Sequence, residues 1–205
     1  MKLRAQPINC TLKGDASTPS STDAMIALLA KAFKACDVKV AETIRLAPLN
    51  IAAGVSSDEG KGDEWPGVRK KILAADILIF GTPIWMGQPS SIAKRVLERM
   101  DAFFDETDKQ GRMPSYSKVA VVAIVGNEDG AHHSFAEIAQ SLNDTGWTIP
   151  PVAACYWVGD AMGDVDFKDL KTTPKMVAKT AKMVAANAAH LAGLLKAAPY
   201  PGQKA

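Results

Sequence analysis

A chain of 205 residues with a hydrophobic fraction of 47% is long enough to bury a core without disulfide or metal staples, and none of its apolar segments reaches the roughly 18 residues of a membrane span. Its net charge of +2, with no dense stripe of lysine and arginine, gives no indication of a nucleic-acid-binding surface. Three widely spaced cysteines, Cys10, Cys36 and Cys155, indicate neither a disulfide framework nor a zinc or iron–sulfur site, and they suit the reducing cytoplasm.

The chain begins with a strand, a polar loop and a helix. Residues 3–12 form a first strand whose apolar pattern is interrupted by Gln6 and Pro7. Residues 13–21, with three serines, one glycine and one proline, are a loop by composition. From Thr22 onward, apolar side chains recur three and four positions apart, which predicts a helix with one buried face.

Two more strands follow, separated by an irregular stretch and a short helix. Residues 38–47 alternate in polarity and predict a second strand, whereas residues 48–64, rich in glycine, serine and aspartate, form the longest irregular piece. A short helix over 66–75 leads to a strand over 76–82 that is apolar on both faces, as in the middle of a parallel sheet. This third strand is expected to stop abruptly at the Gly-Thr-Pro sequence of residues 81–83.

The remaining pattern completes the alternation of strands and helices. In chain order it predicts a helix over 90–104, a strand over 117–126, a helix over 131–146, a strand over 148–159 and a long alanine-rich helix over 174–198. Neither an internal repeat nor a linker interrupts the pattern. Five strand–helix alternations predict one α/β domain over residues 1–205, with a parallel sheet, right-handed crossovers and helices on both faces.

In such sheets ligands bind beyond the carboxyl ends of the strands, so the loops there are the candidate site. The loop after the first strand carries hydroxyl side chains at Thr11, Ser17, Thr18, Ser20, Ser21 and Thr22. It contains a single cation, Lys13, and opens a helix whose free N–H groups can bind an anion. Because Ser20 and Asp23 also have the spacing of a capping box, the loop fits an ordinary helix start as well as a phosphate site. Neither a Walker loop nor a G-x-G-x-x-G motif is present.

The loop after the third strand places large apolar side chains where turn residues are usual. Pro83 stiffens this loop, and Trp85 and Met86 can form a flat, polarizable wall for an aromatic ligand. Gly87 allows the backbone to approach that ligand. Trp85 could equally cap the core or an oligomer interface, and the sequence leaves both interpretations open.

The loop after the fourth strand is GNEDGAHHS, in which Gly126 and Gly130 bracket Asn127, Glu128 and Asp129. It fits a solvated turn, and the two adjacent histidines lack the i,i+4 spacing of a metal pair. Together the three loops offer hydroxyl groups for an anion, an aromatic wall and a glycine-bounded polar turn. This combination suits a planar phosphorylated ring, for which flavin mononucleotide (FMN) is the obvious candidate.

These segments resemble the flavodoxin-like superfamily and, within it, the NAD(P)H-dependent FMN reductase or multimeric-flavodoxin branch. GTPIWMGQPSSIAKRVLERMD is similar to the second loop of that branch, GNEDGAHH to its third loop, and TLKGDASTPSST stands where its phosphate loop should be. The first loop departs from the family pattern, because it is longer than the compact Gly-Ser-x-Arg loop and carries a lysine at the basic position. The resemblance implies a five-stranded parallel sheet of order 2-1-3-4-5 that binds FMN at the strand ends.

The resemblance also implies three groups of FMN-binding residues. The phosphate group would be held by Thr11, Lys13, Ser20, Ser21 and Thr22. The isoalloxazine ring would be contacted by Pro83, Ile84, Trp85, Met86, Gly87 and Gln88. The polar edge of the ring would be completed by Gly126, Asn127, Asp129 and Gly130.

The activity that this resemblance implies is an FMN-dependent oxidoreductase. It would pass hydride from NAD(P)H through bound flavin to a quinone, free flavin or similar acceptor, and it needs no catalytic side chain or metal because the cofactor performs the chemistry. The resemblance further implies a homodimer or homotetramer. One alternative is a flavodoxin-type one-electron carrier, against which the balanced charge counts, because such carriers are usually strongly acidic. A flavin-free binding module of the same fold is the other alternative.

Overall fold

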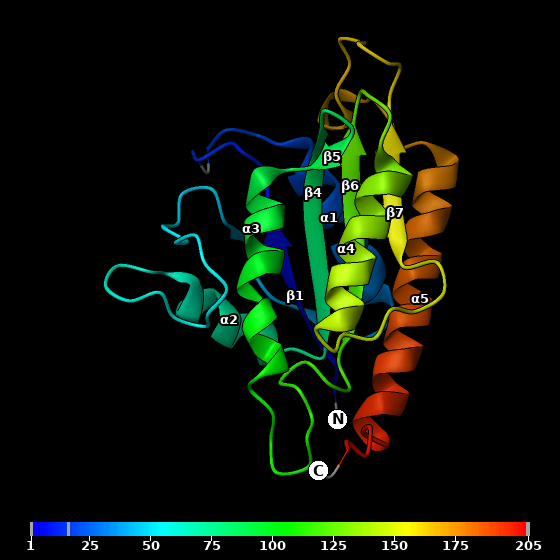
Figure 1. Cartoon of the computed structure of the whole chain (residues 1–205). Helices are drawn as coiled ribbons and strands as arrows, with labels where there is room; N and C mark the ends of the chain where they lie inside the picture. Colours follow the sequence, from blue (N-terminus) through cyan, green and yellow to red (C-terminus); the bar gives the residue numbers. More distant parts are fainter. Residues whose placement is uncertain (1, 16, 204–205) are drawn as a thin grey trace.

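The computed structural model describes residues 2–15 and 17–203 and has a doubly wound α/β architecture (Figure 1). The strands are β1 (Arg4–Asn9), β2 (Lys39–Val40), β3 (Ile44–Arg45), β4 (Ile77–Trp85), β5 (Gln88–Pro89), β6 (Val119–Gly126) and β7 (Ala154–Val158). The main sheet runs β2-β1-β4-β6-β7 with every neighbouring pair parallel. This is the predicted 2-1-3-4-5 order, so the predicted fold class is confirmed. Residues 1, 16 and 204–205, which the domain and first-loop predictions include, lie outside the described part.

Helices cover both faces of the sheet. They are α1 (Ser21–Ala35), α2 (Trp65–Leu73), α3 (Ser91–Arg99), α4 (Ala131–Asp144) and α5 (Lys175–Ala197), with short 3-10 turns η1 (Asp101–Phe104) and η2 (Phe167–Asp169). One core joins the sheet to α2, α3 and α4, and a second joins it to α1 and α5 (Figure 1). Alternation along β4 divides its side chains between the two, because Leu78 and Phe80 enter the first core while Ile77 and Ile79 enter the second. No helix in the described part of the chain is long and apolar enough to cross a membrane.

Helices α1 and α3 begin where their capping residues predict. The Ser20 hydroxyl accepts a hydrogen bond from the Asp23 N–H at 3.1 Å, which is the expected capping interaction at the start of α1. The Ser90 hydroxyl does the same for Ala93 at 3.1 Å in α3 and donates to the Cys10 carbonyl at 2.6 Å. Ser90 therefore fixes the start of α3 against the end of β1, where the first loop leaves the sheet.

The second predicted strand is split into two short pieces. β2 pairs with β1 through Ala5, β3 pairs with it through Ile8, and the interruption lies opposite Gln6 and Pro7. Pro7 has no N–H to give to the ladder. The Gln6 side-chain amide instead donates to the Glu42 carbonyl at 2.9 Å. Gln6 and Pro7, which interrupt the apolar pattern of the first strand, thus lie opposite the break between β2 and β3.

The third strand does not stop at Gly-Thr-Pro as expected. β4 continues through residues 81–83 to Trp85, and it pairs with β6 as far as Pro83. It then turns at Met86 and Gly87 into β5, which pairs back antiparallel, Trp85 lying opposite Gln88. Pro83 is compatible with this course because extended backbone suits its fixed φ. The side chains of the second loop therefore stand on the sheet itself rather than on a free loop.

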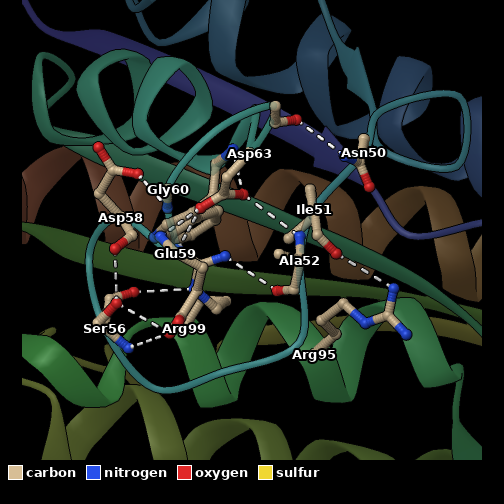
Figure 2. A network of polar contacts seen from close by, with 12 residues as sticks. Asn50, Ile51, Ala52, Ser56, Asp58, Glu59, Gly60, Asp63, Arg95 and Arg99 are labelled. Atoms are coloured by element: carbon tan, nitrogen blue, oxygen red, sulfur yellow. Dashed lines mark hydrogen bonds and ion pairs between the residues drawn. The ribbon is translucent and has the colours of Figure 1, made fainter.

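The irregular segment 48–64 is held by one buried ion pair (Figure 2). Arg99 of α3 contacts the Asp63 carboxylate at 2.6 Å, and both side chains are buried. Its other guanidinium nitrogens donate to the carbonyls of Ser56, at 2.8 Å, and Ala52, at 2.9 Å. Asp63 also accepts N–H hydrogen bonds from Ala52, Glu59 and Trp65. A segment without regular structure therefore gains several of its hydrogen-bond partners from one arginine and one aspartate.

This ion pair makes the stability of the protein depend on pH in acid. The Arg99 guanidinium holds the pKa of the Asp63 carboxyl well below its ordinary value. A carboxyl whose pKa is lower in the folded state stabilises the fold above its unfolded pKa of about 3.9, and that stabilisation is lost as the pH falls further. We expect the urea midpoint of the wild-type protein to fall steeply below about pH 4. Asp63→Asn should be less stable at neutral pH and less sensitive to acid; parallel pH profiles would contradict this.

Candidate functional site

A cavity of about 480 Å³ lies at the carboxyl ends of β1, β4, β6 and β7, where the fold positions ligands. A larger hollow of about 610 Å³ lies at the opposite end of the strands, beside Asp76 and Lys118. Its walls are mixed in charge, and Lys196 there is already paired with Asp76 at 2.8 Å. The smaller cavity lies at the edge of the sheet where this fold binds ligands, and it joins hydroxyl side chains at a helix start to aromatic and apolar side chains, so we consider that cavity the candidate site.

The structure brings most of the predicted site residues together at this cavity. Those that line it are Thr11, Lys13, Ser20, Ser21, Thr22, Pro83, Ile84, Trp85, Met86, Gly126 and Asn127. Four others lie in the same loops but not on the cavity surface: Gly87, Gln88, Asp129 and Gly130. The predicted loops thus meet at one edge of the sheet, while individual residues differ in what they face.

The hydroxyl-rich end of the cavity is the amino terminus of α1. Thr22 and Thr11 are buried there, and the first-turn N–H groups of α1 precede its first internal hydrogen bond, which Ala24 makes to the Ser20 carbonyl. The Ser20 hydroxyl is occupied by the cap, because it also donates to the Asp23 carboxylate at 2.9 Å. The helix terminus and the remaining hydroxyls give this end the polarity that favours an anion.

Two cations stabilise the first loop. Lys13 lines the cavity, and its ammonium donates to the Pro19 carbonyl at 3.0 Å. Arg45, at the end of β3, pairs with the Asp23 carboxylate and donates to the Thr18 carbonyl at 3.0 Å. Arg45 was not predicted, because only the pairing of β3 with β1 brings it under this loop. It offsets the negative charge of Asp23 beside the expected anion site.

The opposite wall of the cavity is carried by the β4–β5 hairpin. Met86 has φ 54° and Gly87 has φ 73°, and positive φ at both central residues defines a type I′ turn. The turn leaves Trp85 half exposed and Met86 almost fully exposed at the mouth of the cavity. A flat aromatic side chain and a flexible thioether therefore border the entrance, as the sequence predicts for an aromatic ligand.

The hairpin turn rests on the loop after β6. The Glu128 carboxylate accepts the Met86 N–H and the Gly87 N–H, each at 3.1 Å. Gly130, with φ 129°, lies directly against Gly87, and a Cβ at this position would be 2.5 Å from the Gly87 carbonyl oxygen. Gly130 is thus required for contact between two loops. From the sequence, Glu128 is predicted only as a residue of a solvated turn.

A fourth wall, from the end of β7 and the segment that follows it, was not predicted. Its residues on the cavity are Trp157, Met162, Gly163, Asp166 and Phe167. The rings of Trp157 and Phe167 lie 5.6 Å apart, and they face the cavity from the side of α1 and α5. The Asn127 side-chain amide donates to the Gly163 carbonyl at 2.8 Å and so ties this loop to the third one. The strand order could have predicted this wall, because the carboxyl end of β7 lies at the same edge of the sheet as those of its parallel neighbours.

The site offers neither a thiol nucleophile nor a metal centre. Burial raises the pKa of the Cys10 thiol, at the start of the first loop. It also raises the pKa of the Cys155 thiol, to about 12, so both groups are held as neutral thiols. Among residues 2–15 and 17–203, no group of three or more metal-ligating side chains is placed to hold an ion.

Comparisons with known proteins agree with this geometry. The family described as NADPH-dependent FMN reductase matches residues 10–160. The chain is 37% identical over 163 residues to a divalent metal cation transporter MntH of Mycobacterium bovis, which covers 78% of this chain and 24% of that protein. It is 36% identical over 147 residues to 8-demethyl-8-aminoriboflavin-5'-phosphate synthase of Streptomyces davaonensis, which covers 67% of this chain and 54% of that one. The chain thus spans from about a quarter to about half the length of these relatives.

Among solved structures, the fold is similar to that of RosB with the bound intermediate 8-demethyl-8-formylriboflavin-5'-phosphate. The two superpose with a TM-score of 0.86 at 30% sequence identity, covering 97% of this chain and 82% of RosB. The similarity therefore includes the elements that build the cavity.

Proposed function

The chain belongs to the NADPH-dependent FMN reductase family, and on that basis we propose that it is an FMN-dependent oxidoreductase using NAD(P)H. Hydride would pass from the nicotinamide through FMN to a quinone, free flavin or similar acceptor. The observation that carries this proposal is the cavity that joins the amino terminus of α1 to aromatic side chains at the ends of β4 and β7.

The residues of the cavity fit FMN in size, charge and shape. Its volume of about 480 Å³ lies in the range of small-molecule sites. Thr11, Lys13, Ser21 and Thr22 stand where a phosphate would meet hydroxyl groups, an ammonium and the free N–H groups of α1. Trp85 at the end of β4 and Trp157 near the end of β7 supply flat apolar surface for a ring. When bound, FMN supplies the capacity to accept and release hydride.

The chain's own residues bind, orient and exclude water. Ile84 is buried and Trp85 is fixed by the hairpin, so the ring would meet a preformed surface. The Asn127 side-chain amide donates to the loop after β7 and would therefore hold two walls of the cavity in fixed relative positions. Four predicted site residues do not line the cavity: Gly87, Gln88, Asp129 and Gly130. We propose that they affect FMN binding indirectly, by fixing the positions of the loops that do.

We also propose that residues 1–205 form one FMN-binding domain, that the protein acts in the cytoplasm, and that it assembles as a homodimer or homotetramer. The widely spaced cysteines support the reducing compartment. The exposed apolar side chains of Leu12, Met86 and Met162 at the cavity mouth support coverage by a second subunit.

A second candidate is that riboflavin-5'-phosphate is itself the substrate, modified on its ring. The similarity to RosB with its bound riboflavin-phosphate intermediate, over 97% of this chain, favours this candidate. In both candidates the same phosphate cradle and ring walls hold the flavin, so binding alone does not separate them. The chemical fate of the bound flavin does.

One experiment tests both candidates. We expect FMN to bind roughly ten- to a hundredfold more tightly than riboflavin, because each hydrogen bond to a charged phosphate contributes about 1.5–3 kcal/mol. Anaerobic NADPH or NADH should then bleach the flavin absorbance, and a quinone should restore it with the mass of FMN unchanged. A changed flavin mass would favour the second candidate. Flavin that stays oxidised with nicotinamide would favour the one-electron carrier, and equal binding of FMN and riboflavin would contradict the phosphate assignment.

A further inference from the structure

The hairpin turn at the cavity mouth is held in an unfavourable backbone conformation. Met86 adopts φ 54°, a left-handed conformation that L-residues other than asparagine and aspartate rarely adopt. Such a residue is disfavoured roughly 5- to 30-fold relative to its usual conformation. A type I′ turn usually has asparagine, aspartate or glycine at its first central position and glycine at its second, yet this chain has Met86 first and Gly87 second. Something outside the turn must therefore stabilise it.

Glu128 is placed to do so. Both oxygens of its carboxylate are used, Oε1 by the Met86 N–H and Oε2 by the Gly87 N–H, each at 3.1 Å. These are the two consecutive N–H groups of the turn's central residues, and hydrogen bonds to a charged acceptor are about twice as strong as neutral ones. The residues are 42 and 41 positions apart in the chain, so the bonds join two separate loops.

These two hydrogen bonds from Met86 and Gly87 to Glu128, which we call the clamp, act on a wall of the proposed flavin site. Trp85 immediately precedes the turn and lines the cavity together with Met86 and Glu128 itself. Because both turn N–H groups face the carboxylate, the hairpin presents side chains rather than backbone donors to the cavity. Gly130 also supports the turn, because the absence of a side chain at this position lets Gly87 pack against the loop that carries Glu128.

We propose that Glu128 is a positioning residue, which clamps the Met86–Gly87 turn and thereby fixes Trp85 as a preformed wall for the flavin ring. This inference rests on the proposed function for its ligand, but the clamp itself is a property of the chain. Without the carboxylate, the turn populates other conformations in which Trp85 leaves the cavity. Flavin binding must then select the competent conformation, which weakens the apparent affinity by the fraction that is populated.

The test uses the whole protein and two substitutions at one position. Glu128→Ala removes both acceptors, and Glu128→Gln retains one acceptor oxygen. We expect FMN affinity, measured by fluorescence titration, to fall roughly 10- to 100-fold in the alanine variant and by an intermediate factor in the glutamine variant. Glu137→Ala is the matched control, because this carboxylate, on α4, contacts His133 at 3.1 Å and does not line the cavity. The control should bind FMN as the wild type does.

A rescue separates positioning from general damage. Glycine adopts positive φ without penalty, so adding Met86→Gly to Glu128→Ala should recover at least about fivefold in FMN affinity. Amide hydrogen exchange of the flavin-free protein gives an independent readout. Glu128→Ala should accelerate exchange at Met86 and Gly87 while leaving the amides of β6 unchanged.

Each outcome decides the inference. Unchanged exchange at the two turn amides, wild-type FMN affinity in Glu128→Ala, or failure of the Met86→Gly rescue would overturn it. A wild-type protein whose flavin is not reduced by NADPH or NADH would refute the proposed reaction but leave this inference intact if the variants behave as described. If the wild type bound no FMN, the exchange measurement would still decide whether the clamp exists.

Discussion

Arg99→Met is expected to lower the free energy of unfolding by about 3–5 kcal/mol, because it leaves the buried Asp63 carboxylate without its partner. The carbonyl oxygens of Ser56 and Ala52 would also lose the donors that fix the irregular segment. Methionine retains much of the apolar contact that the arginine makes with Trp65, whose ring centroid lies 5.9 Å from the guanidinium carbon. Urea denaturation followed by circular dichroism measures the difference.

The matched control for this prediction is Arg95→Met, one turn earlier in α3. Arg95 donates to the Ile51 carbonyl at 3.2 Å and is not part of the buried ion pair (Figure 2). Losing that single hydrogen bond should cost about 0.5–1.5 kcal/mol. If the Arg99 and Arg95 variants unfolded at the same urea concentration, the ion pair would not be the contact that holds residues 48–64.

Gly130→Ala should weaken FMN binding at least about tenfold and destabilise the fold by about 2–6 kcal/mol. The new Cβ would lie 2.5 Å from the Gly87 carbonyl oxygen, and the residue has φ 129°. A strained backbone costs about 1–3 kcal/mol and a forced displacement of packed atoms about as much again. The displaced group is the hairpin turn, so Trp85 should move with it.

Gly193→Ala is the control for that substitution, because a Cβ at this position in α5 meets no atom within 4 Å. It should leave flavin binding unchanged and raise stability by about 0.5–1 kcal/mol, as alanine does in a helix. Equilibrium dialysis with FMN and urea denaturation measure both quantities. Normal FMN content in Gly130→Ala would show that the two loops can separate without opening the ring wall.

The fold could be predicted because its signals are local and repeated. The central strands β4 and β6 carry strand-length apolar runs, the crossover helices carry an apolar face, and Ser20 marks the start of α1 as the capping spacing indicates. The end of a strand was harder to predict where a residue type is compatible with both a turn and a strand. Pro83 suggested the end of β4, yet the extended backbone that a strand needs is compatible with proline.

The missing parts of the site depend on pairs that are distant in the chain. Glu128 bonds a turn 41 and 42 residues before it, and Arg45 reaches Asp23 only through the pairing of β3 with β1. Trp157 and Phe167 have unremarkable neighbours in the sequence, and only the sheet order brings them to the cavity. Composition and spacing identify loops rich in binding groups, whereas contacts between those loops become visible in three dimensions.

The unbroken course of β4 limits how this protein can diversify. Successive side chains of a strand point to opposite faces, so the residue that reaches the cavity at position 85 is set by the count of residues from Ile77. One residue inserted or deleted between them would exchange the side chains that enter the two cores and would turn Trp85 to the other face of the sheet. Ligand preference can therefore change by substitution at Trp85 or Met86, whose side chains are exposed and lie outside both cores. A change in the length of this strand would disturb both cores.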